Sequence, residues 1–402
     1  MSLANTARSY GSVTKTFHWL TALLILTAIP LGWYANQLPY DTSDQLAQKA
    51  LVFSLHKTVG VTVFAVALVR ILWAVTQPKP AGLHPERKLE TMLAETVHWL
   101  LYGALVLVPL TGWIHHAASE GFAPIWWPFG QTLPFVPRDT ELSALFAGLH
   151  IVTKWVLIGA IGLHIAGALK HHLIDRDSTL RRMLPGISIG PVPAREKHTV
   201  LPVVAALLLW AGAIGIGSVS GAYDSHSAIV PQAAALEEVE TDWTVQNGSL
   251  GITVTQLGST VEGRFADWTA AITFEPRETQ GPAGRVDVTV AIGSLTLGSV
   301  TTEALGPEFF AAETFPTARF EAEILRTADG YIAQGPLTIR DQSQEITLPF
   351  NIAITDATAT ASGALSVNRL EYGVGQSYAD ESSVGFGVEI RFDLTATRTD
   401  PA

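Results

Sequence analysis

The 402-residue sequence contains no cysteine, and no lysine follows Lys197. Without cysteine there can be no disulfide, no thiolate metal site and no iron–sulfur cluster. The C-x-x-C-H motif that attaches haem covalently is excluded for the same reason. Any haem in this protein would therefore be held without a covalent link.

The charge is divided unevenly along the chain. Up to Gln232 there are 16 Lys and Arg against 12 Asp and Glu, whereas from Glu237 onward there are 9 Arg, no Lys and 24 acidic residues. The first part has long runs of Leu, Ala, Val, Ile and Trp, and the second has short runs rich in Thr, Gly, Phe and Glu. This pattern indicates two domains in two environments, a bilayer and then water.

Five apolar stretches are long enough to cross the roughly 30 Å hydrocarbon core of a bilayer, which takes about 20 residues. They are Phe17–Tyr34, Leu51–Val75, Met92–Ile114, Leu145–Leu169 and Val200–Val219. No small-residue cleavage site occurs before Tyr34, where the first stretch ends. We therefore expect a retained helix and not a cleaved signal peptide.

The loops between these stretches differ in positive charge. The N-terminal segment, the Gln77–Thr91 loop and the Lys170–His198 loop hold 2, 3 and 6 Lys and Arg, and the two intervening loops hold only Lys49 and Arg138. The positive-inside rule therefore predicts a cytoplasmic N-terminus. Five spans then place everything after Gly221 on the outer side, which is the periplasm in a Gram-negative cell.

Beyond a small, polar linker at Ser220–Glu240, the hydrophobic period changes to two. Eight strand-like runs, from LGITVTQ at Leu250 to VGFGVEIRFDLTATR at Val384, are broken by Gly, Pro, Asp and Asn. We predict an all-β unit of about eight antiparallel strands, as one closed barrel or a sandwich. An eight-stranded barrel has room for one small ligand.

Four of the twelve histidines lie at two matched depths in the predicted spans. His150 and His164 are 14 residues apart, which is nearly four helical turns and about 21 Å, so they share one helix face. His18, at the cytoplasmic start of the first span, comes level with His164. His56, near the outer start of the second span, comes level with His150. Each pair could fill both axial positions of a haem iron, which favours electron transfer over oxygen binding.

Intramembrane histidines also serve as proton relays or packing residues, but agreement among four depths favours two haems. His98 in the third span is a rival to His18. His115 and His116 lie at the outer end of the third span, and His171 and His172 lie in the basic cytoplasmic face. The remaining three, His84, His198 and His226, fall in loops where no partner is visible.

Three cations lie at the predicted haem levels. Arg70 shares the helix face of His56 but lies 14 residues later, at the inner level, where a buried guanidinium needs an anion such as a haem propionate. Lys57 and Lys154 lie close to His56 and His150. They could pair with propionates, snorkel to the interface or attract a small anion to the outer haem. Glycines near these levels would leave room for porphyrin faces: Gly60, Gly148, Gly159, Gly162 and Gly167.

The first half carries distinctive motifs: FHW at Phe17, HKTVG at His56, RILW at Arg70, HWLLY…PLTGW from His98, and the long run from His150 to Gly186 with its His–x13–His spacing and RRMLPG end. Together they resemble bacterial cytochrome b561 over about residues 5–186. The resemblance implies four transmembrane helices that hold two b haems, with ligands at the positions of His18, His56, His150 and His164. It also implies electron transfer between the periplasm and the quinone pool or, for one member type, superoxide oxidation with ubiquinone reduction.

The second half carries DWTV at Asp242, VEGRFADWTAAITF, FFAAETFPTARFEAEIL, GPLTIRDQSQEITLPF and VNRLEYGVG. These motifs resemble the YceI family, lipocalin-like barrels that bind polyisoprenoid chains, over about Asp242–Arg398. TTEALGPEFF stands where the family has an Arg-Asp-x-His-like stretch, so the polar head-group contacts of that stretch are not carried over to this chain.

The fifth span belongs to neither resemblance, and it would deliver the barrel to the outer side. We predict a bacterial inner-membrane protein in four parts: a cytochrome b561-like four-helix domain at 1–186, a cytoplasmic loop and fifth helix at 187–222, a linker at 223–240 and a periplasmic YceI-like barrel at 241–402.

An isoprenoid quinone would join the two halves, because it has a redox head and a polyisoprenoid tail. We predict a di-haem b quinone oxidoreductase whose barrel binds the quinone chain through apolar inward residues: Phe265, Trp268, Phe309, Phe310, Phe315 and Phe320. Three alternatives stay open: a superoxide:ubiquinone oxidoreductase with the barrel only as a lipid-binding module, an isoprenoid carrier with regulatory haems, and a cytochrome subunit of a separate dehydrogenase. No nucleic-acid partner is expected, and the electron donor and the oligomeric state are left open.

Overall fold

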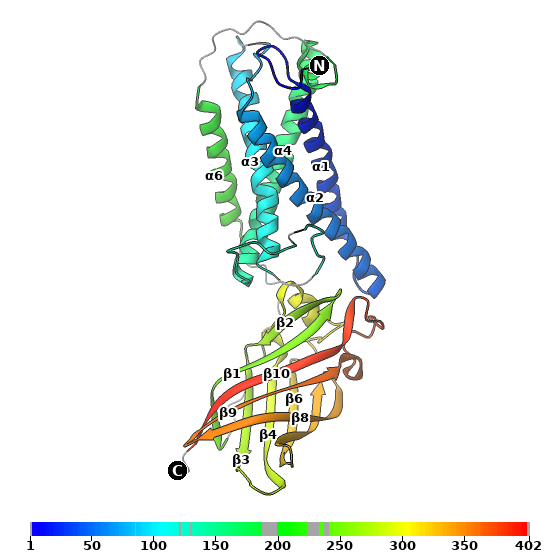
Figure 1. Cartoon of the computed structure of the whole chain (residues 1–402), viewed down its shortest axis with the longest axis vertical. Helices are drawn as coiled ribbons and strands as arrows, with labels where there is room; N and C mark the ends of the chain where they lie inside the picture. The colour runs from blue at the N-terminus through cyan, green and yellow to red at the C-terminus, as the bar shows by residue number, and fades with distance from the viewer. Residues whose placement is uncertain are drawn as a thin grey trace. The chain divides into compact units, whose positions relative to one another are not determined.

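The computed structural model describes residues 2–84, 86–119, 122–128, 130–186, 199–223, 233–236 and 241–399. They form two compact units, one mainly helical and one built on a β-sheet (Figure 1). His198, His226 and most of the predicted linker, residues 224–232 and 237–240, lie outside the described residues.

Five helices are long and apolar enough to cross a membrane: α1 (Ser12–Gln37), α2 (Ser43–Val75), α3 (Lys88–Ala117), α4 (Thr140–Lys170) and α6 (Leu201–Val219). The five predicted spans are thus confirmed as helices. All but the last exceed their apolar stretches because helix continues into the polar flanks. Asp139, for example, caps α4 by accepting a hydrogen bond from the backbone N–H of Leu142 at 2.7 Å.

Small residues inside the helical unit let the helices approach closely. Ala67, Ala104 and Ala160 are almost completely buried among larger apolar side chains. Helix α6 lies beside α3 (Figure 1), and the indole of Trp210 occupies the room left by Gly103, where an added Cβ would meet Trp210 Nε1 at 2.8 Å. The fifth helix is therefore packed onto the bundle.

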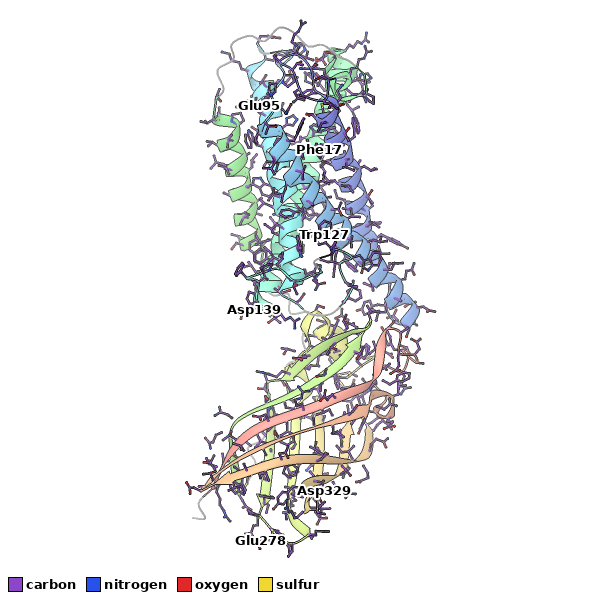
Figure 2. All side chains as sticks on the ribbon, viewed as in Figure 1. Phe17, Glu95, Trp127, Asp139, Glu278 and Asp329 are labelled. Atoms are coloured by element: carbon purple, nitrogen blue, oxygen red, sulfur yellow. The ribbon has the colours of Figure 1, made fainter. Side chains whose placement is uncertain are left out.

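The helical unit ends in polar segments. Glu95 in the early part of α3 and Asp139 before α4 lie toward its opposite ends (Figure 2). After α4 the chain continues as a π-helix at His171–Asp175 and a short helix α5 at Thr179–Met183.

The second unit, which we call the β unit, is one antiparallel sheet of ten strands within residues 241–399. The strand order is β3-β4-β6-β7-β8-β9-β10-β1-β2-β5. The strands are β1 (Trp243–Gln256), β2 (Ser259–Phe265), β3 (Trp268–Phe274), β4 (Gly281–Ala291), β5 (Leu295–Thr296), β6 (Thr317–Arg326), β7 (Tyr331–Ile339), β8 (Gln342–Thr355), β9 (Thr358–Asn368) and β10 (Val384–Arg398). A short helix α7 (Thr301–Leu305) interrupts the strands.

The predicted count of eight strands was wrong. The run VEGRFADWTAAITF is two strands, because the chain leaves the sheet at Ala266 and Asp267, and the two-residue β5 was not predicted. In the residues that the structure describes, the end strands β3 and β5 do not pair with each other, so the sheet curls without closing. The indole N–H of Trp243 on β1 donates to the carbonyl of Phe274 on β3 at 3.0 Å and bridges part of this gap.

Alternation along the strands gives the curled sheet an apolar inner face. On β6, Phe320, Ala322 and Ile324 are buried, whereas Glu321 and Glu323 between them are exposed. The inner side chains of this sheet form the walls of the cavity described below.

Candidate functional site

Helices α1, α2 and α4 bring four histidines together as two pairs. The rings of His18 and His164 have centroids 6.0 Å apart, and those of His56 and His150 are 6.4 Å apart. A metal–imidazole bond is about 2 Å long, and adding roughly 1 Å from nitrogen to ring centre puts two rings on one metal about 6 Å apart. Both predicted pairs have the spacing of two axial ligands of one iron.

The two pairs lie far apart along the bundle. His150 and His164 both belong to the continuous helix α4, and 14 residues of α-helix span about 21 Å. We call His18 and His164 the first pair, and His56 and His150 the second pair.

The second pair is oriented by backbone carbonyls. Nδ1 of His56 lies 2.9 Å from the carbonyl oxygen of Ala28, and Nδ1 of His150 lies 2.9 Å from that of Val108. A carbonyl can only accept, so each Nδ1 carries the proton and each Nε2 keeps its lone pair. This arrangement holds the tautomer that metal-ligating histidines use.

Two glycines make room for the rings of the second pair. A Cβ on Gly32 of α1 would lie 2.7 Å from Cε1 of His56, and a Cβ on Gly112 of α3 would lie 3.0 Å from Nδ1 of His150. Any larger residue would push the rings away from their carbonyl partners. Neither glycine was predicted to contact a histidine, since only the packing of neighbouring helices reveals which glycine faces which ring.

The glycines named from the sequence behave differently. An added Cβ at Gly60, Gly159, Gly162 or Gly167 would meet no described atom within 4 Å, whereas Gly148 packs against the carbonyl of Ala222. Four of these five positions thus border open space, and the fifth serves helix packing.

His98 on α3 lies beside the first pair, with its ring centroid 5.2 Å from that of His164. This is shorter than the roughly 6 Å that two bonds to a shared metal require. Nδ1 of His98 also lies 2.6 Å from the carbonyl of Ala94 in its own helix. The geometry therefore favours His18 over His98 as the partner of His164.

Cations accompany both pairs. Arg70 interacts electrostatically with His18 and His164 and lies against the ring of Tyr102, 5.8 Å from its centroid. No carboxylate among the described residues forms an ion pair with Arg70. Lys57 is buried and, with Lys154, interacts electrostatically with His56.

These residues fit haem b in three ways: the ring spacing of both pairs, the Nε2 atoms of the second pair oriented by carbonyls, and an intramembrane guanidinium with no carboxylate partner among the described residues. His18 and His164 could hold one iron, and His56 and His150 another. Arg70 could bind a propionate at the first pair, and Lys57 and Lys154 could do so at the second.

Other histidines are also paired. His115 and His116 lie 4.4 Å apart by ring centroid. No partner for His84 was visible in the sequence, but its Nε2 lies 3.1 Å from Oδ2 of Asp177, and its ring stacks on that of His171. The loop after α4 folds back on the loop before α3, which no local sequence pattern reveals.

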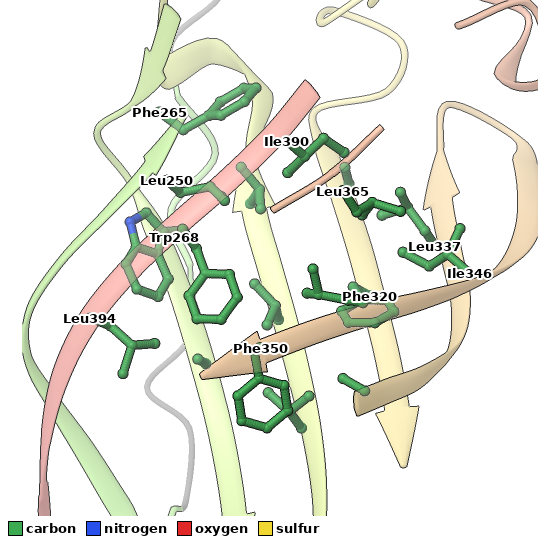
Figure 3. Close-up of a pocket in the computed structure, with 18 of the residues that line it drawn as sticks. Leu250, Phe265, Trp268, Phe320, Leu337, Ile346, Phe350, Leu365, Ile390 and Leu394 are labelled. Carbon is green, nitrogen blue, oxygen red and sulfur yellow. The ribbon is translucent and has the colours of Figure 1, made fainter. Parts of the chain in front are cut away.

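The β unit encloses a cavity of about 240 Å³ between the curled strands. This is many times the roughly 10–15 Å³ that one water needs. Leu250, Trp268, Phe320 and Phe350 project into it from different strands (Figure 3). Apart from the indole nitrogens, only Arg369 and Tyr372 among the lining side chains carry polar atoms.

Four of the six predicted aromatic residues line this cavity: Phe265, Trp268, Phe310 and Phe320. The other two are not among its lining residues. Phe309 lies against Tyr378, with ring centroids 5.2 Å apart, and Phe315 lies under the guanidinium of Arg340.

The two polar residues at the cavity wall differ in their contacts. The guanidinium of Arg369 donates five hydrogen bonds to backbone carbonyls, so its hydrogen-bonding capacity is used within the fold. The hydroxyl of Tyr372 is buried and has no hydrogen-bond partner in the described part of the chain. Burial raises the pKa of Tyr372 to about 12, with a smaller contribution from Glu371.

Comparison with known families divides the chain in the same way. The model of prokaryotic cytochrome b561 matches residues 9–186, and the model of the YceI-like domain matches residues 241–396. Cytochrome b561 homolog 2 of Escherichia coli (strain K12) is 32% identical over 186 residues, which are 46% of this chain and 95% of that protein. The probable superoxide oxidase CybB of Yersinia pestis is 28% identical over 182 residues, 44% of this chain and 97% of that protein.

Among solved structures, the crystal structure of Burkholderia cenocepacia BcnA is 30% identical with a TM-score of 0.35, covering 37% of this chain and 96% of that one. A polyisoprenoid binding domain from Saccharophagus degradans is 12% identical with a TM-score of 0.32, covering 40% of this chain and 100% of that one.

Proposed function

Because the chain belongs to the prokaryotic cytochrome b561 family through residues 9–186 and carries a YceI-like domain at residues 241–396, we propose that it is a di-haem b membrane oxidoreductase. It moves electrons between a periplasmic donor or acceptor and an isoprenoid quinone, and the β unit binds the isoprenoid chain. The paired histidines at two depths of one helix bundle carry this proposal.

The family implies haem b, and the geometry supports two of them. Bound haem supplies reversible one-electron oxidation and reduction of iron. His18 with His164 would hold one haem iron and His56 with His150 the other, and ligation by two histidines would favour electron transfer over the binding of oxygen. The carbonyls of Ala28 and Val108 fix the second pair.

The cavity of the β unit supports an isoprenoid ligand. Its wall is almost wholly apolar, and Arg369 is already satisfied by backbone carbonyls. Such a wall gains free energy from burying hydrocarbon, about 25 cal/mol per Å², and offers almost nothing to a charged solute. A polyisoprenoid tail is the part of a quinone that suits it.

The charge bias of the loops supports the orientation. Eleven Lys and Arg on one set of loops against two on the other favour a cytoplasmic N-terminus in a bacterial inner membrane. With five spans, the β unit then lies in the periplasm.

The test is to purify the intact chain in mild detergent and measure two quantities together. We expect two haems per chain by pyridine haemochrome assay, and a prenyl lipid enriched over the total membrane lipid by mass spectrometry. One haem per chain would refute the two-site arrangement, and a lipid profile equal to that of the membrane would refute the role of the β unit.

A second function is favoured by the lysines beside the second pair. Lys57 and Lys154 interact electrostatically with His56 and, when protonated, would attract a small anion. In the superoxide:ubiquinone alternative, pulse-generated superoxide reduces the haems at rates near the diffusion limit, and Lys57→Gln slows this step. Reduction that is slow and independent of superoxide would rule this alternative out.

A further inference from the structure

A cluster of metal-ligating side chains lies outside the haem sites, where the loop before α3 meets the segment after α4. Oδ2 of Asp177 lies 3.1 Å from Nε2 of His84 and 2.6 Å from Nδ1 of His171. The two imidazole rings are nearly parallel, at 9°, with centroids 6.1 Å apart. One carboxylate oxygen is thus shared by two imidazoles from separate segments.

The three ligand atoms have the spacing of a small metal site. All lie within 4.8 Å of one another. Zinc bonds of about 2.0–2.1 Å at tetrahedral angles place neighbouring ligand atoms roughly 3.3 Å apart. Both contacts to Asp177, at 3.1 and 2.6 Å, are shorter than that value, so a zinc ion would require these side chains to move apart by roughly 0.2 to 0.7 Å. Two imidazole nitrogens and one carboxylate oxygen form a donor set that suits zinc.

The surrounding charges single out Asp177. The neighbouring carboxylates of Glu90 and Asp175 are both contacted by Lys170, at 2.5 and 2.7 Å. Asp177 instead receives the backbone N–H of Thr179 on Oδ1 and the two imidazoles on Oδ2. Among the described residues, no lysine or arginine forms an ion pair with Asp177. A divalent cation between the three side chains would supply the missing positive charge.

The backbone explains how the ligands come together. The π-helix His171–Asp175 continues α4, and Arg176 turns the chain with a left-handed φ of 53°. The N–H of Asp177 then donates to the carbonyl of His171 at 3.1 Å, which returns the aspartate to the side of the histidine.

We propose that His84, His171 and Asp177 bind one zinc ion, with the fourth position open to water. Bound zinc ties the loop between α2 and α3 to the end of α4. His171 lies seven residues after His164, or about 10 Å along the helix axis, so this link steadies the part of α4 that carries the first pair.

The test uses the full, haem-loaded chain in detergent with any affinity tag removed. The protein is dialysed against a chelator, titrated with zinc chloride by calorimetry, and analysed for bound zinc after gel filtration. We expect one tight site per chain, which His84→Ala and Asp177→Asn each weaken at least tenfold. The matched control is His172→Ala, because His172 is exposed and outside the cluster.

Haem content and the melting temperature without zinc show whether each variant is folded. In the wild type, added zinc should raise the melting temperature, and in the His84→Ala variant it should not. The proposal is overturned if the chain binds no zinc, or if the His84→Ala, His171→Ala and Asp177→Asn triple variant binds it as tightly as the wild type. In either case the three side chains only form hydrogen bonds that link the two segments.

Discussion

The helical unit and the β unit enclose opposite kinds of interior. The bundle places imidazoles, a guanidinium and a buried ammonium among apolar helices, as at His56, Arg70 and Lys57. The β unit surrounds about 240 Å³ with a wall that is apolar except at Arg369 and Tyr372. Buried polar groups cost free energy unless they form hydrogen bonds or ion pairs. The two interiors therefore suit different kinds of ligand.

The two units differ in whether their buried polar side chains find partners within the chain itself. In the β unit, the carbonyls of the chain saturate Arg369. In the bundle, each Nε2 of the second pair is held with its lone pair free, and Arg70 has no carboxylate partner among the described residues. The interior of the bundle therefore suits a group with metal and anionic parts, and that of the β unit suits a hydrocarbon.

The largest effect should follow from removing one axial histidine. His150→Ala leaves His56 without its partner, so we expect haem content to fall from two per chain to one. His164→Ala should remove the other haem, leaving the second pair intact. Pyridine haemochrome assay and redox titration of each variant measure this loss, and the two variants should retain haems of different midpoint potential.

His98 provides the control for this prediction. Its ring lies 5.2 Å from His164, but the spacing favours His18 as the ligand. His98→Ala should keep two haems, whereas His18→Ala should keep one. The opposite result would assign the first pair to His98 and His164.

The sequence predicted the bundle better than the sheet, for physical reasons. Helical pairs follow from local periodicity, so the depths of His150 and His164 could be calculated before the fold was known. The sheet depends on pairing between distant strands, and a break of two residues at Ala266 and Asp267 divided one predicted strand. The roles of Gly32 and Gly112 depend on which helix lies opposite, and that information is not local.

The next effect tests the apolar interior of the β unit. Ala361 on β9 lines the cavity, and Ala361→Phe should fill part of it. We expect at least a tenfold loss of co-purified prenyl lipid, with haem content unchanged. Ala364→Phe on the exposed face of the same strand is the matched control. If both variants retain equal amounts of lipid, the cavity is not the site that binds it.

A smaller effect should follow from filling the space beside a haem ligand. Gly112→Ala puts a Cβ 3.0 Å from Nδ1 of His150 and must displace the ring or helix α3. We expect partial loss of one haem, with a cost of about 1–3 kcal/mol for overpacking. Gly212→Ala on α6 is the control, since its Cβ would meet no described atom within 4 Å and α6 carries none of the four histidines. Equal haem retention in the two variants would show that the close fit is not required.

The smallest effect concerns Tyr372, the exception in the apolar wall. Burial raises its pKa to about 12, while in the unfolded chain it ionises near pH 10. Between these values the unfolded chain releases the proton and the folded chain keeps it, so stability is full below pH 10 and falls as the pH rises toward 12. Tyr372→Phe should make this fall shallower, though Tyr378, whose pKa burial also raises to about 12, keeps part of it.

Thermal melting of the full chain between pH 9 and 11.5, followed by the circular dichroism of the β-sheet, measures the slope. Tyr331→Phe is the matched control, because its hydroxyl accepts a hydrogen bond from the N–H of Arg277 at 3.0 Å. At neutral pH, Tyr372→Phe should be neutral or stabilising by up to about 1 kcal/mol, since it removes an unpartnered buried hydroxyl. If this variant instead loses prenyl lipid, the hydroxyl of Tyr372 contacts the ligand. The β unit would then resemble the bundle in keeping a buried polar group for its ligand.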